Sequence, residues 1–215
     1  MVKKNDIPHL ILILIPFIII AIFWNDFPDR IAIHFNYQNE PDSFADKETG
    51  LFLIPAMNLV FFFLFKLIPR IDPKRNFNLF GKSYHILRLA IHAFLLFMFI
   101  ILAMYALGYD LNIGFIVVYA VTLIFLVAGN FLGKIRANYF LGIRTPWTLE
   151  NEENWNKTHR VAGGVWVGGS IIMIVLLPFI NLELLPWVFF SYFLLIVIIP
   201  VIYSYIIYNR KADRA

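Results

Sequence analysis

Three basic side chains recur at a spacing that could support chemistry inside a membrane. His85, Arg88 and His92 are three and four positions apart, so they share one face of a helix. Such a face could bind an anionic group or act as a proton-sensitive switch. The ordinary alternative is that Arg88 extends to the lipid headgroups and that His92 hydrogen-bonds to a neighbouring helix. Asn130, in a later apolar run, is a further candidate for a polar contact between helices.

Familiar catalytic and metal-binding patterns do not occur in the sequence. The absence of cysteine excludes disulfides, thiolate catalysis and cysteine-based zinc sites. There is no HExxH, GxSxG or P-loop string, and the acids lie in loops or at the ends of apolar runs. One histidine, His34, lies near three carboxylates of the same segment, Asp26, Asp29 and Asp42, which is a poor metal signature. We therefore predict no enzyme active site, no cofactor and no metal.

Composition indicates which elements position these side chains. The chain is 60% apolar and only 15% charged, whereas a soluble domain has about 25% charged residues. Six apolar stretches are each long enough to cross a hydrocarbon core, which needs roughly 17–25 helical residues. The sequence thus predicts an all-α integral membrane protein, a bundle of six transmembrane helices at Ile7–Trp24, Leu51–Pro69, Tyr84–Leu107, Leu111–Leu132, Val161–Ile180 and Pro186–Tyr208.

The distribution of lysine and arginine predicts the orientation of these spans. With the N-terminus inside, sixteen of the eighteen basic residues fall in or next to cytoplasmic segments, and only Arg30 and Lys47 fall outside. The inverted arrangement would reverse this bias, so the positive-inside rule favours both termini in the cytoplasm. We predict a multi-pass protein of a bacterial cell membrane. We attribute its net charge of +4 to the basic residues that orient the spans, and we predict no direct binding of nucleic acid.

Two connections are too long to be simple turns. The outer one, Asn25–Gly50, is an extracellular loop of about 26 residues whose segment Arg30–Phe35 could form a short strand. In the inner one, Gly133–Arg160, Thr148 could cap a helix with acids in its first turn. Trp155 and His159, four apart, would share a face of that helix. We predict a cytoplasmic amphipathic segment lying near the membrane surface.

Glycines in the fifth predicted span form a GxxxG arrangement. Gly164 and Gly168 at this spacing let two helix backbones approach closely. Either they support a dimer or they pack against another helix of the same chain, and the many internal partners in a six-helix bundle favour packing. The oligomeric state stays open.

The inner loop carries the most specific strings in the chain, NYFLGIRTPWT at 138–148 and NWNKTHR at 154–160. They resemble the SdpI immunity-protein family. The outer loop resembles the DUF1648 domain, through PDRIAIHFN at 28–36 and PDSF at 41–44. Two positions depart from that pattern: Ala32 replaces a usual proline, and Asn39-Glu40 stands where a glycine is common.

The resemblance implies two regions, residues 1–80 of DUF1648 type and residues 81–215 of SdpI type. It also implies a membrane immunity protein that gives resistance to a secreted toxin peptide. The best-known member is in addition a receptor that holds a small DNA-binding repressor at the membrane. The residues that would serve such partners are Pro28, His34 and Asp42 outside, and Gly142, Arg144, Thr145, Pro146, Trp147, Thr148, Trp155, His159 and Arg160 inside.

Two other functions remain open at this point. The face formed by His85, Arg88 and His92, with the prolines in several spans, would suit a transporter of small molecules or lipids. An enzyme at the cytoplasmic surface, with His159 as a base, ranks last because no nucleophile or metal set accompanies it.

Overall fold

The computed structural model describes residues 4–212, and Lys3 and Arg214, which contribute to the charge asymmetry, lie outside that range. Six helices are long and apolar enough to cross a membrane, which confirms the predicted number. Five are the helices α1 (Ile7–Phe23), α2 (Lys47–Ile71), α4 (Ile113–Leu132), α6 (Glu152–Leu176) and α7 (Leu185–Ala212). The sixth is α3 (Gly81–Ala106), which the 3-10 turn η2 (Asn76–Phe80) precedes. Shorter helical turns are η1 (Lys4–Asp6), α5 (Pro146–Glu150) and η3 (Leu177–Phe179).

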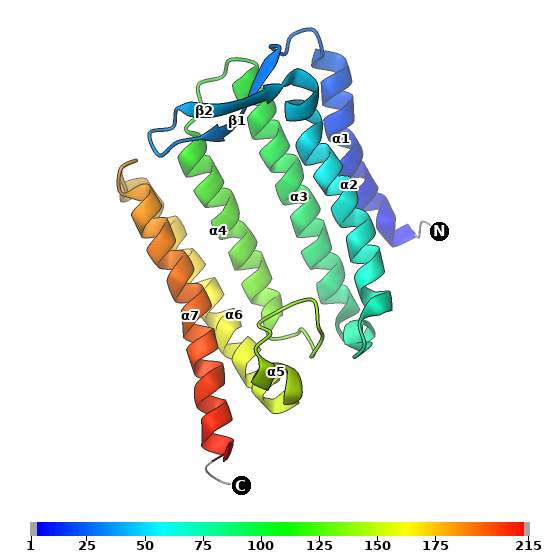
Figure 1. Ribbon diagram of the computed structural model, residues 1–215, viewed down its shortest axis with the longest axis vertical. Helices are drawn as coiled ribbons and strands as arrows, with labels where there is room; N and C mark the ends of the chain where they lie inside the picture. Colours follow the sequence, from blue (N-terminus) through cyan, green and yellow to red (C-terminus); the bar gives the residue numbers. More distant parts are fainter. Residues whose placement is uncertain (1–3, 213–215) are drawn as a thin grey trace.

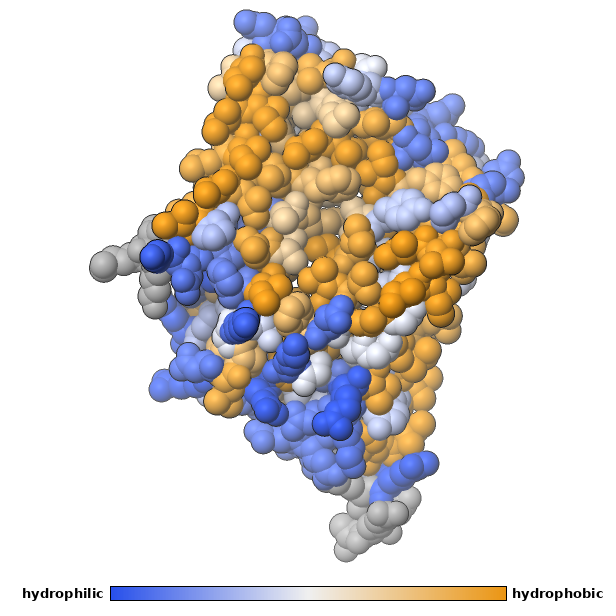
Figure 2. Space-filling model, turned by 180° about the vertical axis from the view of Figure 1, so that it is seen from behind, coloured by the Kyte–Doolittle hydropathy of each residue, from blue (hydrophilic) through white to orange (hydrophobic). Residues whose placement is uncertain are grey.

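The outer surface of the helices is apolar. Large side chains such as Ile18 on α1, Phe63 on α2 and Leu195 on α7 are more than half exposed. Figure 2 shows hydrophobic residues over most of this helical face, with hydrophilic residues gathered toward its two ends. Exposure of such an area to water would be unfavourable, whereas lipid solvates it. The chain is a multi-pass membrane protein.

The helices form two groups that meet along α3 and α4 (Figure 1). In the first, α1 and α2 pack against α3; in the second, α6 packs between α4 and α7. The predicted boundary near residue 80 stays a prediction, and the structure places α3 in contact with α1, α2 and α4.

A β-hairpin lies across one end of the bundle, which we call the hairpin end (Figure 1). The strands β1 (Arg30–Phe35) and β2 (Pro41–Asp46) are antiparallel, with Ile31 opposite Ala45 and irregular pairing around His34. The strand predicted at 30–35 is confirmed. Its partner was not predicted, because proline and aspartate are poor strand formers. The all-α class therefore holds for the spans, but the outer connection adds a small sheet.

The hairpin is fixed at its base and at its tip. At the base, the side chain of Ile31 is buried, and a Cβ added to Gly50 would lie 2.5 Å from the Cβ of Ile31. At the tip, Asn39 adopts φ +67°, a conformation that glycine and asparagine tolerate best. Its side chain donates to the carbonyl of Leu111 (3.1 Å) and accepts from the backbone N–H of Gly114 (3.2 Å). The hairpin is thereby held over α3 and α4.

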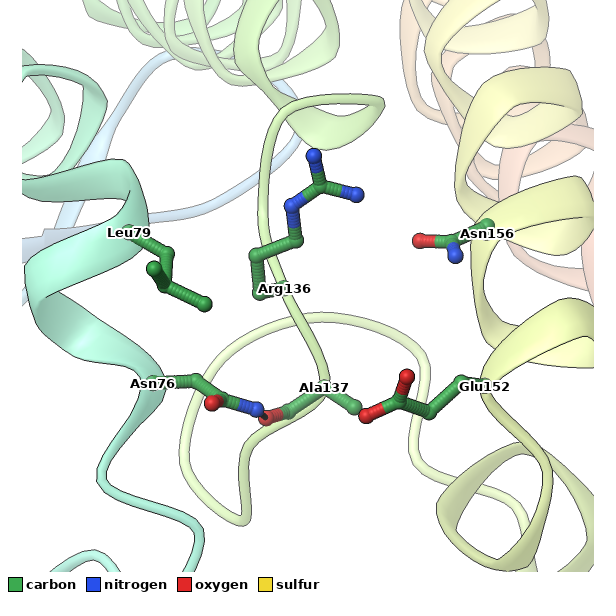
Figure 3. A pocket seen from close by; sticks show the side chains of 6 residues that line it. All are labelled: Asn76, Leu79, Arg136, Ala137, Glu152 and Asn156. Carbon is green, nitrogen blue, oxygen red and sulfur yellow. Dashed lines mark hydrogen bonds between the residues drawn. The ribbon is translucent and has the colours of Figure 1, made fainter.

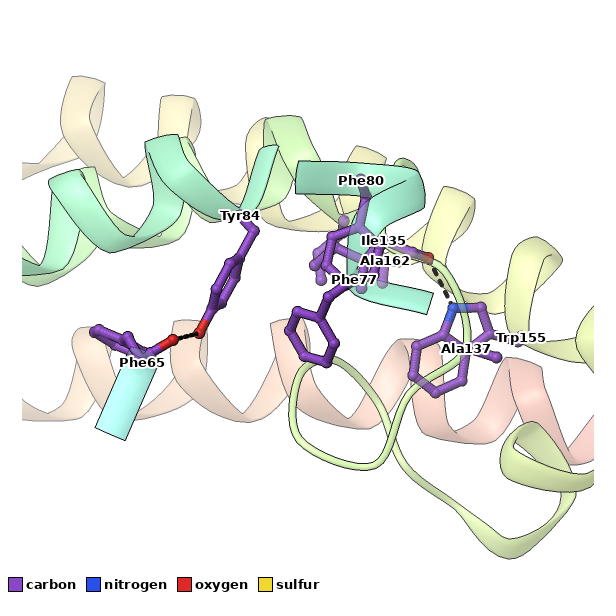
Figure 4. Close-up of a cluster of buried hydrophobic side chains, with 9 residues drawn as sticks. Phe65, Phe77, Phe80, Tyr84, Ile135, Ala137, Trp155 and Ala162 are labelled. Carbon is purple, nitrogen blue, oxygen red and sulfur yellow. Dashed lines mark hydrogen bonds between the residues drawn. The ribbon is translucent and has the colours of Figure 1, made fainter. Parts of the chain in front are cut away.

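The opposite end, which we call the loop end, contains an aromatic core. This core joins the start of α3 to the connection between α4 and α6, which we call the motif loop (residues 133–151). Figure 4 shows the Tyr84 hydroxyl donating to the carbonyl of Phe65 (2.6 Å) and the Trp155 indole donating to the carbonyl of Ile135 (2.8 Å). The motif loop is therefore packed as part of the fold.

Candidate functional site

The predicted pairing of Trp155 and His159 is confirmed, and it holds the motif loop in place. Their rings are stacked with centroids 4.0 Å apart, and both side chains are buried. His159 Nδ1 donates to the carbonyl of Trp155 (2.8 Å), and His159 Nε2 accepts from the backbone N–H of Ile143 (2.9 Å). Both ring nitrogens are thus engaged in a neutral imidazole. A buried and doubly bonded histidine positions the loop and is not available as a base.

The turn around Gly142 has the shape that this histidine requires. Gly142 adopts φ +100°, and a Cβ added there would collide with His159 Nε2. Three residues after Gly142, Thr145 precedes α5 as its N-cap, and it forms a capping box with Thr148. Thr148 was predicted to be the cap itself, which is wrong: it is the third helical residue, and its buried hydroxyl donates within the turn to the carbonyl of Ile143 (2.9 Å).

The predicted separate amphipathic helix at the membrane surface is also wrong. Asn151 caps a new helix by accepting from the backbone N–H groups of Glu153 and Asn154 (3.0 Å each). From Glu152 that helix continues without a break into the fifth span. Asparagine is as good a cap as threonine, and this choice places Trp155 in the core instead of at the headgroups.

The motif loop is also tied to the last span. The indole of Trp147 donates to the hydroxyl of Ser204 on α7 (2.8 Å) and packs against Tyr205 and Tyr208. Asn154 donates to the backbone carbonyl of Ser204 (3.0 Å). The arrangement joins α5, α6 and α7, so the tryptophan is a structural contact in addition to any interfacial role.

The remaining motif residues face outward. Arg144 is exposed, and its guanidinium donates to the carbonyl of Tyr139 (2.7 Å). Pro146 occupies the first turn of α5, where its missing N–H costs nothing, and Arg160 is exposed on α6. Of the predicted partner-binding set, these three are the best placed to touch another molecule.

A polar pocket of about 310 Å³ opens beside the motif loop (Figure 3). It is lined by side chains from three segments that are distant in the sequence, Asn76, Leu79, Arg136, Ala137, Glu152 and Asn156. In Figure 3 the Arg136 guanidinium and the Asn156 amide lie on opposite sides of it. Leu79 is 70% exposed at its edge. Sequence reasoning missed this pocket; its only signal was that Arg136 and Glu152 flank the motif strings and that Asn156 lies within the second of them.

The turn between α2 and α3 fixes one wall of this pocket. Asp72 is buried, and its carboxylate accepts from the backbone N–H of Tyr139 (2.9 Å). Lys74 donates to the carbonyl of Leu149 (2.6 Å), and Asn76 donates to the carbonyl of Ala137 (2.8 Å). These contacts were not predicted, because each joins residues more than sixty positions apart.

The predicted polar face on α3 becomes part of a larger cluster between α1, α2 and α3. His85 contacts His9 of α1 through ring nitrogens 3.1 Å apart, and His92 Nδ1 donates to the side-chain carbonyl of Asn58 on α2. His9, His92 and Asn58 are almost fully buried. The packing of α1 on α3 covers His9. Asn58 bridges α2 and α3.

Arg88 pairs with an acid, so its guanidinium is not simply directed to the headgroups, which was the ordinary alternative. Its guanidinium lies 3.6 Å from the carboxylate of Asp6, which also pairs with Lys66 at 2.8 Å. The side chains of Arg88 and Asp6 are only 12% and 7% exposed. Asp6 precedes the first span, and nothing in the local sequence links it to α3. Two cations against one carboxylate leave this cluster positive.

The cluster contains unused hydrogen-bonding capacity. Among the described residues, its buried nitrogens without a hydrogen-bond partner are His9 Nδ1, His92 Nε2, Arg88 Nε and Arg88 Nη2. Such groups could hold a proton or an anionic group. Asn130 does not take part: it is exposed, and its amide donates to the carbonyl of Leu126 in its own helix (2.9 Å).

At the hairpin end, the predicted residues lie on the outer surface. His34 and Asp42 pair across the two strands at 2.5 Å, and both are solvent-exposed. Pro28 is exposed in the turn before β1. Within residues 4–212, no three histidine or acidic side chains converge on a position that could hold a metal ion.

The glycines of α6 divide into two classes. A Cβ on Gly163 would lie 2.9 Å from the carbonyl oxygen of Gly129 on α4, so this glycine allows close packing. A Cβ on Gly169 would meet Ile196 of α7 at 3.2 Å. Gly164 and Gly168 would meet nothing within 4 Å. The preferred reading of packing within the chain is therefore wrong for the GxxxG pair and applies to the flanking glycines.

Comparison with known proteins confirms the resemblance seen in the sequence. Residues 134–204 match the SdpI/YfhL protein family, and residues 11–59 match a domain of unknown function, DUF1648. The chain is 27% identical over 207 residues to a Bacillus subtilis (strain 168) protein described as "Immunity protein SdpI", covering 96% of this chain and 97% of that protein. No solved structure matches the chain significantly. These matches favour a membrane immunity protein over the transporter, and they point away from an enzyme.

Proposed function

We propose that this chain is an immunity protein that protects its cell from a secreted toxin peptide, because residues 134–204 match the SdpI/YfhL protein family. The observation that carries the proposal is the match to an immunity protein along almost the full length of both chains. The engagement of both ring nitrogens of His159 supports a function without catalysis.

The proposal includes an orientation, with the hairpin end outside and the loop end in the cytoplasm. Eight carboxylates lie at the hairpin end against two basic residues, Arg30 and Lys47. The other lysines and arginines of the described residues lie toward the loop end, as the positive-inside rule requires of a cytoplasmic face. A secreted peptide would then meet the hairpin, and a cytoplasmic partner would meet the motif loop.

Capture of a repressor is a second, separable part of the proposal, and the pocket of Figure 3 favours it. Most of the motif residues are used inside the fold, so they set the shape of the loop. Besides the outward-facing Arg144, Pro146 and Arg160, the pocket offers a partner the exposed Arg136, Glu152 and Asn156, next to the exposed apolar Leu79. A charged pocket beside an apolar side chain is a common arrangement for a protein contact.

Resistance is the readout that tests the main proposal. A strain that lacks the gene is exposed to the secreted peptide fraction of its own species, with and without the wild-type gene on a plasmid. We expect the deletion to sensitise the cells and the plasmid to restore resistance. Equal survival of the deletion strain across all fractions would contradict the proposal.

Variants of the pocket test the second part. Arg136→Ala and Asn156→Ala should retain resistance and lose toxin-dependent induction of a reporter driven by the gene's own promoter. Arg210→Ala, a cytoplasmic-end arginine outside the pocket, is the matched control. Loss of resistance in the pocket variants at normal protein levels would show that the pocket serves immunity itself.

A further inference from the structure

A large apolar cavity lies beneath the β-hairpin. Its volume is about 670 Å³, within the roughly 300–1,000 Å³ range of ligand pockets. We call it the hairpin groove; its walls come from β1, α2, α3, α4 and α7, and they include Phe35, Ile54, Leu102, Val117, Leu185 and Phe189. The groove lies where the two helix groups meet, under the strands that cross the ends of α3 and α4 in Figure 1.

The roof of the groove is held rigidly. Besides the contacts at its base and tip, Phe35 packs edge-on against Tyr105 of α3, with ring centroids 4.7 Å apart. The turn residue Asn36 accepts from the backbone N–H groups of Gln38 (3.0 Å) and Glu40 (2.9 Å). A roof with this many fixed contacts keeps the cavity preformed, which lowers the cost of filling it.

The mouth of the groove has a different chemistry from its interior. A neighbouring hollow of about 880 Å³ shares Tyr37, Leu182 and Pro186 with it and adds Glu183 and Trp187. Tyr37 and Trp187 are 63% and 71% exposed. Exposed aromatic faces beside a carboxylate are suited to a cationic group that has a peptide or apolar body.

The charge around the mouth selects among the molecules that could enter. The exposed carboxylate of Glu183 lines it, and those of Glu40 and Asp42 contact the groove residues Asn36 and His34, within an end that has eight acids and two bases. Anionic lipid headgroups would be repelled from this rim, whereas a cationic group would be attracted and concentrated. An apolar interior with an acidic, aromatic mouth therefore fits a molecule with an apolar segment and a cationic end.

We propose that the hairpin groove binds an apolar segment of a cationic secreted peptide, whose basic residues lie against the acidic rim between the hairpin and the start of α7. This inference rests on the proposed immunity function and identifies where, and by what chemistry, the toxin is recognised. His34 and Asp42 then act at the rim, and the apolar residues of β1, α4 and α7 accept the peptide side chains.

The direct test measures peptide binding to the full-length protein in phosphatidylcholine nanodiscs, whose lipid has no net charge. The probes are two synthetic peptides with the same leucine-alanine segment and a photoreactive leucine, one with three lysines at one end and one with three glutamates. We expect the lysine peptide to bind at least tenfold more tightly than the glutamate peptide, after subtraction of empty nanodiscs. Its cross-links should map to residues that line the groove.

Two matched pairs of variants locate the site. Val117→Trp narrows the groove and should weaken the lysine peptide at least tenfold, whereas Leu123→Trp on the lipid-facing side of the same helix should leave affinity within twofold. Glu183→Gln at the rim should weaken binding about threefold, and Asp26→Asn, an exposed acid away from the groove, should not. Each variant is first checked for wild-type yield and a single monodisperse species.

Several results would overturn the inference. The inference is wrong if the two peptides bind equally, if Val117→Trp leaves binding unchanged, or if the cross-links are confined to the lipid-facing surface. It is also wrong if the groove of the purified protein is found to hold a lipid or a second copy of the chain, which Val117→Trp displaces. The resistance assay separates the two proposals. If Val117→Trp gives full resistance but no longer binds peptide, the groove is not the toxin site, and the proposed immunity function still holds. If the wild-type gene gives no resistance, the proposed immunity function is wrong, and only the binding measurements test the groove.

Discussion

The substitution Gly142→Ala tests whether the motif loop is held by the bond between Ile143 and His159. At φ +100° an alanine has a strained backbone, at a cost of about 1–2 kcal/mol. Its Cβ would also displace His159 Nε2 and leave the N–H of Ile143 without its acceptor, at a cost of about 1–3 kcal/mol. The total of about 3 kcal/mol corresponds to a roughly hundredfold increase in the open form of the loop.

Limited trypsin digestion of the detergent-solubilised protein measures this opening, because Arg144 is exposed within the loop. When opening is fast relative to cleavage, the rate after Arg144 follows the population of the open form. We expect cleavage of Gly142→Ala to be roughly a hundredfold faster than that of the wild type. Gly81→Ala is the control, because its Cβ would meet nothing within 4 Å and its φ of −54° suits any residue.

A double-mutant comparison separates the two causes. His159→Ala removes both the obstruction and the acceptor, so Gly142→Ala in that background should add only the backbone strain, roughly a tenfold change in cleavage rate. The reasoning is refuted if Gly142→Ala is cut at the wild-type rate, or if it has the same effect with and without His159.

Three further outcomes follow from the packing. Asp6→Asn should lower the free energy of unfolding in mixed micelles by about 3 kcal/mol, because it removes the carboxylate charge that pairs with the largely buried Arg88 and Lys66. Glu153→Gln in an exposed pair should change this free energy by less than about 0.5 kcal/mol, and equal effects of the two variants would contradict the pairing. In the same unfolding measurement, Gly163→Ala should be destabilising by about 2 kcal/mol, because its Cβ would press on the carbonyl of Gly129 of α4. Gly164→Ala should be destabilising by less than about 0.5 kcal/mol, because its Cβ meets nothing within 4 Å, and the reverse order would contradict the α4–α6 contact. Trp147→Phe should lower the free energy of unfolding by about 1 kcal/mol, because it removes the hydrogen bond to Ser204 of α7. An unchanged unfolding midpoint would show that this hydrogen bond does not stabilise the protein.

Features set by short-range periodicity could be predicted from the sequence. Hydrophobic length predicted the six spans, and alternation predicted the strand at 30–35. The spacing of four predicted that Trp155 and His159 share a helical face, on which the structure shows their rings stacked. In each case the property depends on residues within one or two turns. The positions of helix starts were less predictable, because Thr145, Thr148 and Asn151 are all good caps and only the tertiary contacts of Trp155 select among them.

The polar contacts between helices could not be predicted, because their partners are far apart in the chain. The ion pair of Arg88 could not be predicted, because its partner Asp6 is far away in the sequence and is brought to it by the packing of α1 on α3. The bond between Asp72 and the backbone N–H of Tyr139 was overlooked for the same reason. Single-sequence reasoning recognises a side chain that is costly to bury, but the identity of its partner comes only from the fold.

The hairpin groove and the motif loop lie at opposite ends of the same helices, so a signal from bound peptide to the loop would have to pass along those helices. Both α4 and α7 line the groove; α4 ends next to the loop, and α7 carries Ser204, which bonds to Trp147. A peptide bound between these helices influences the loop only if its affinity differs between two arrangements of α4 and α7. Immunity by simple capture needs no such difference, whereas induction of a promoter does. A variant that binds peptide and protects but does not induce would therefore have lost the difference between those arrangements and kept the site.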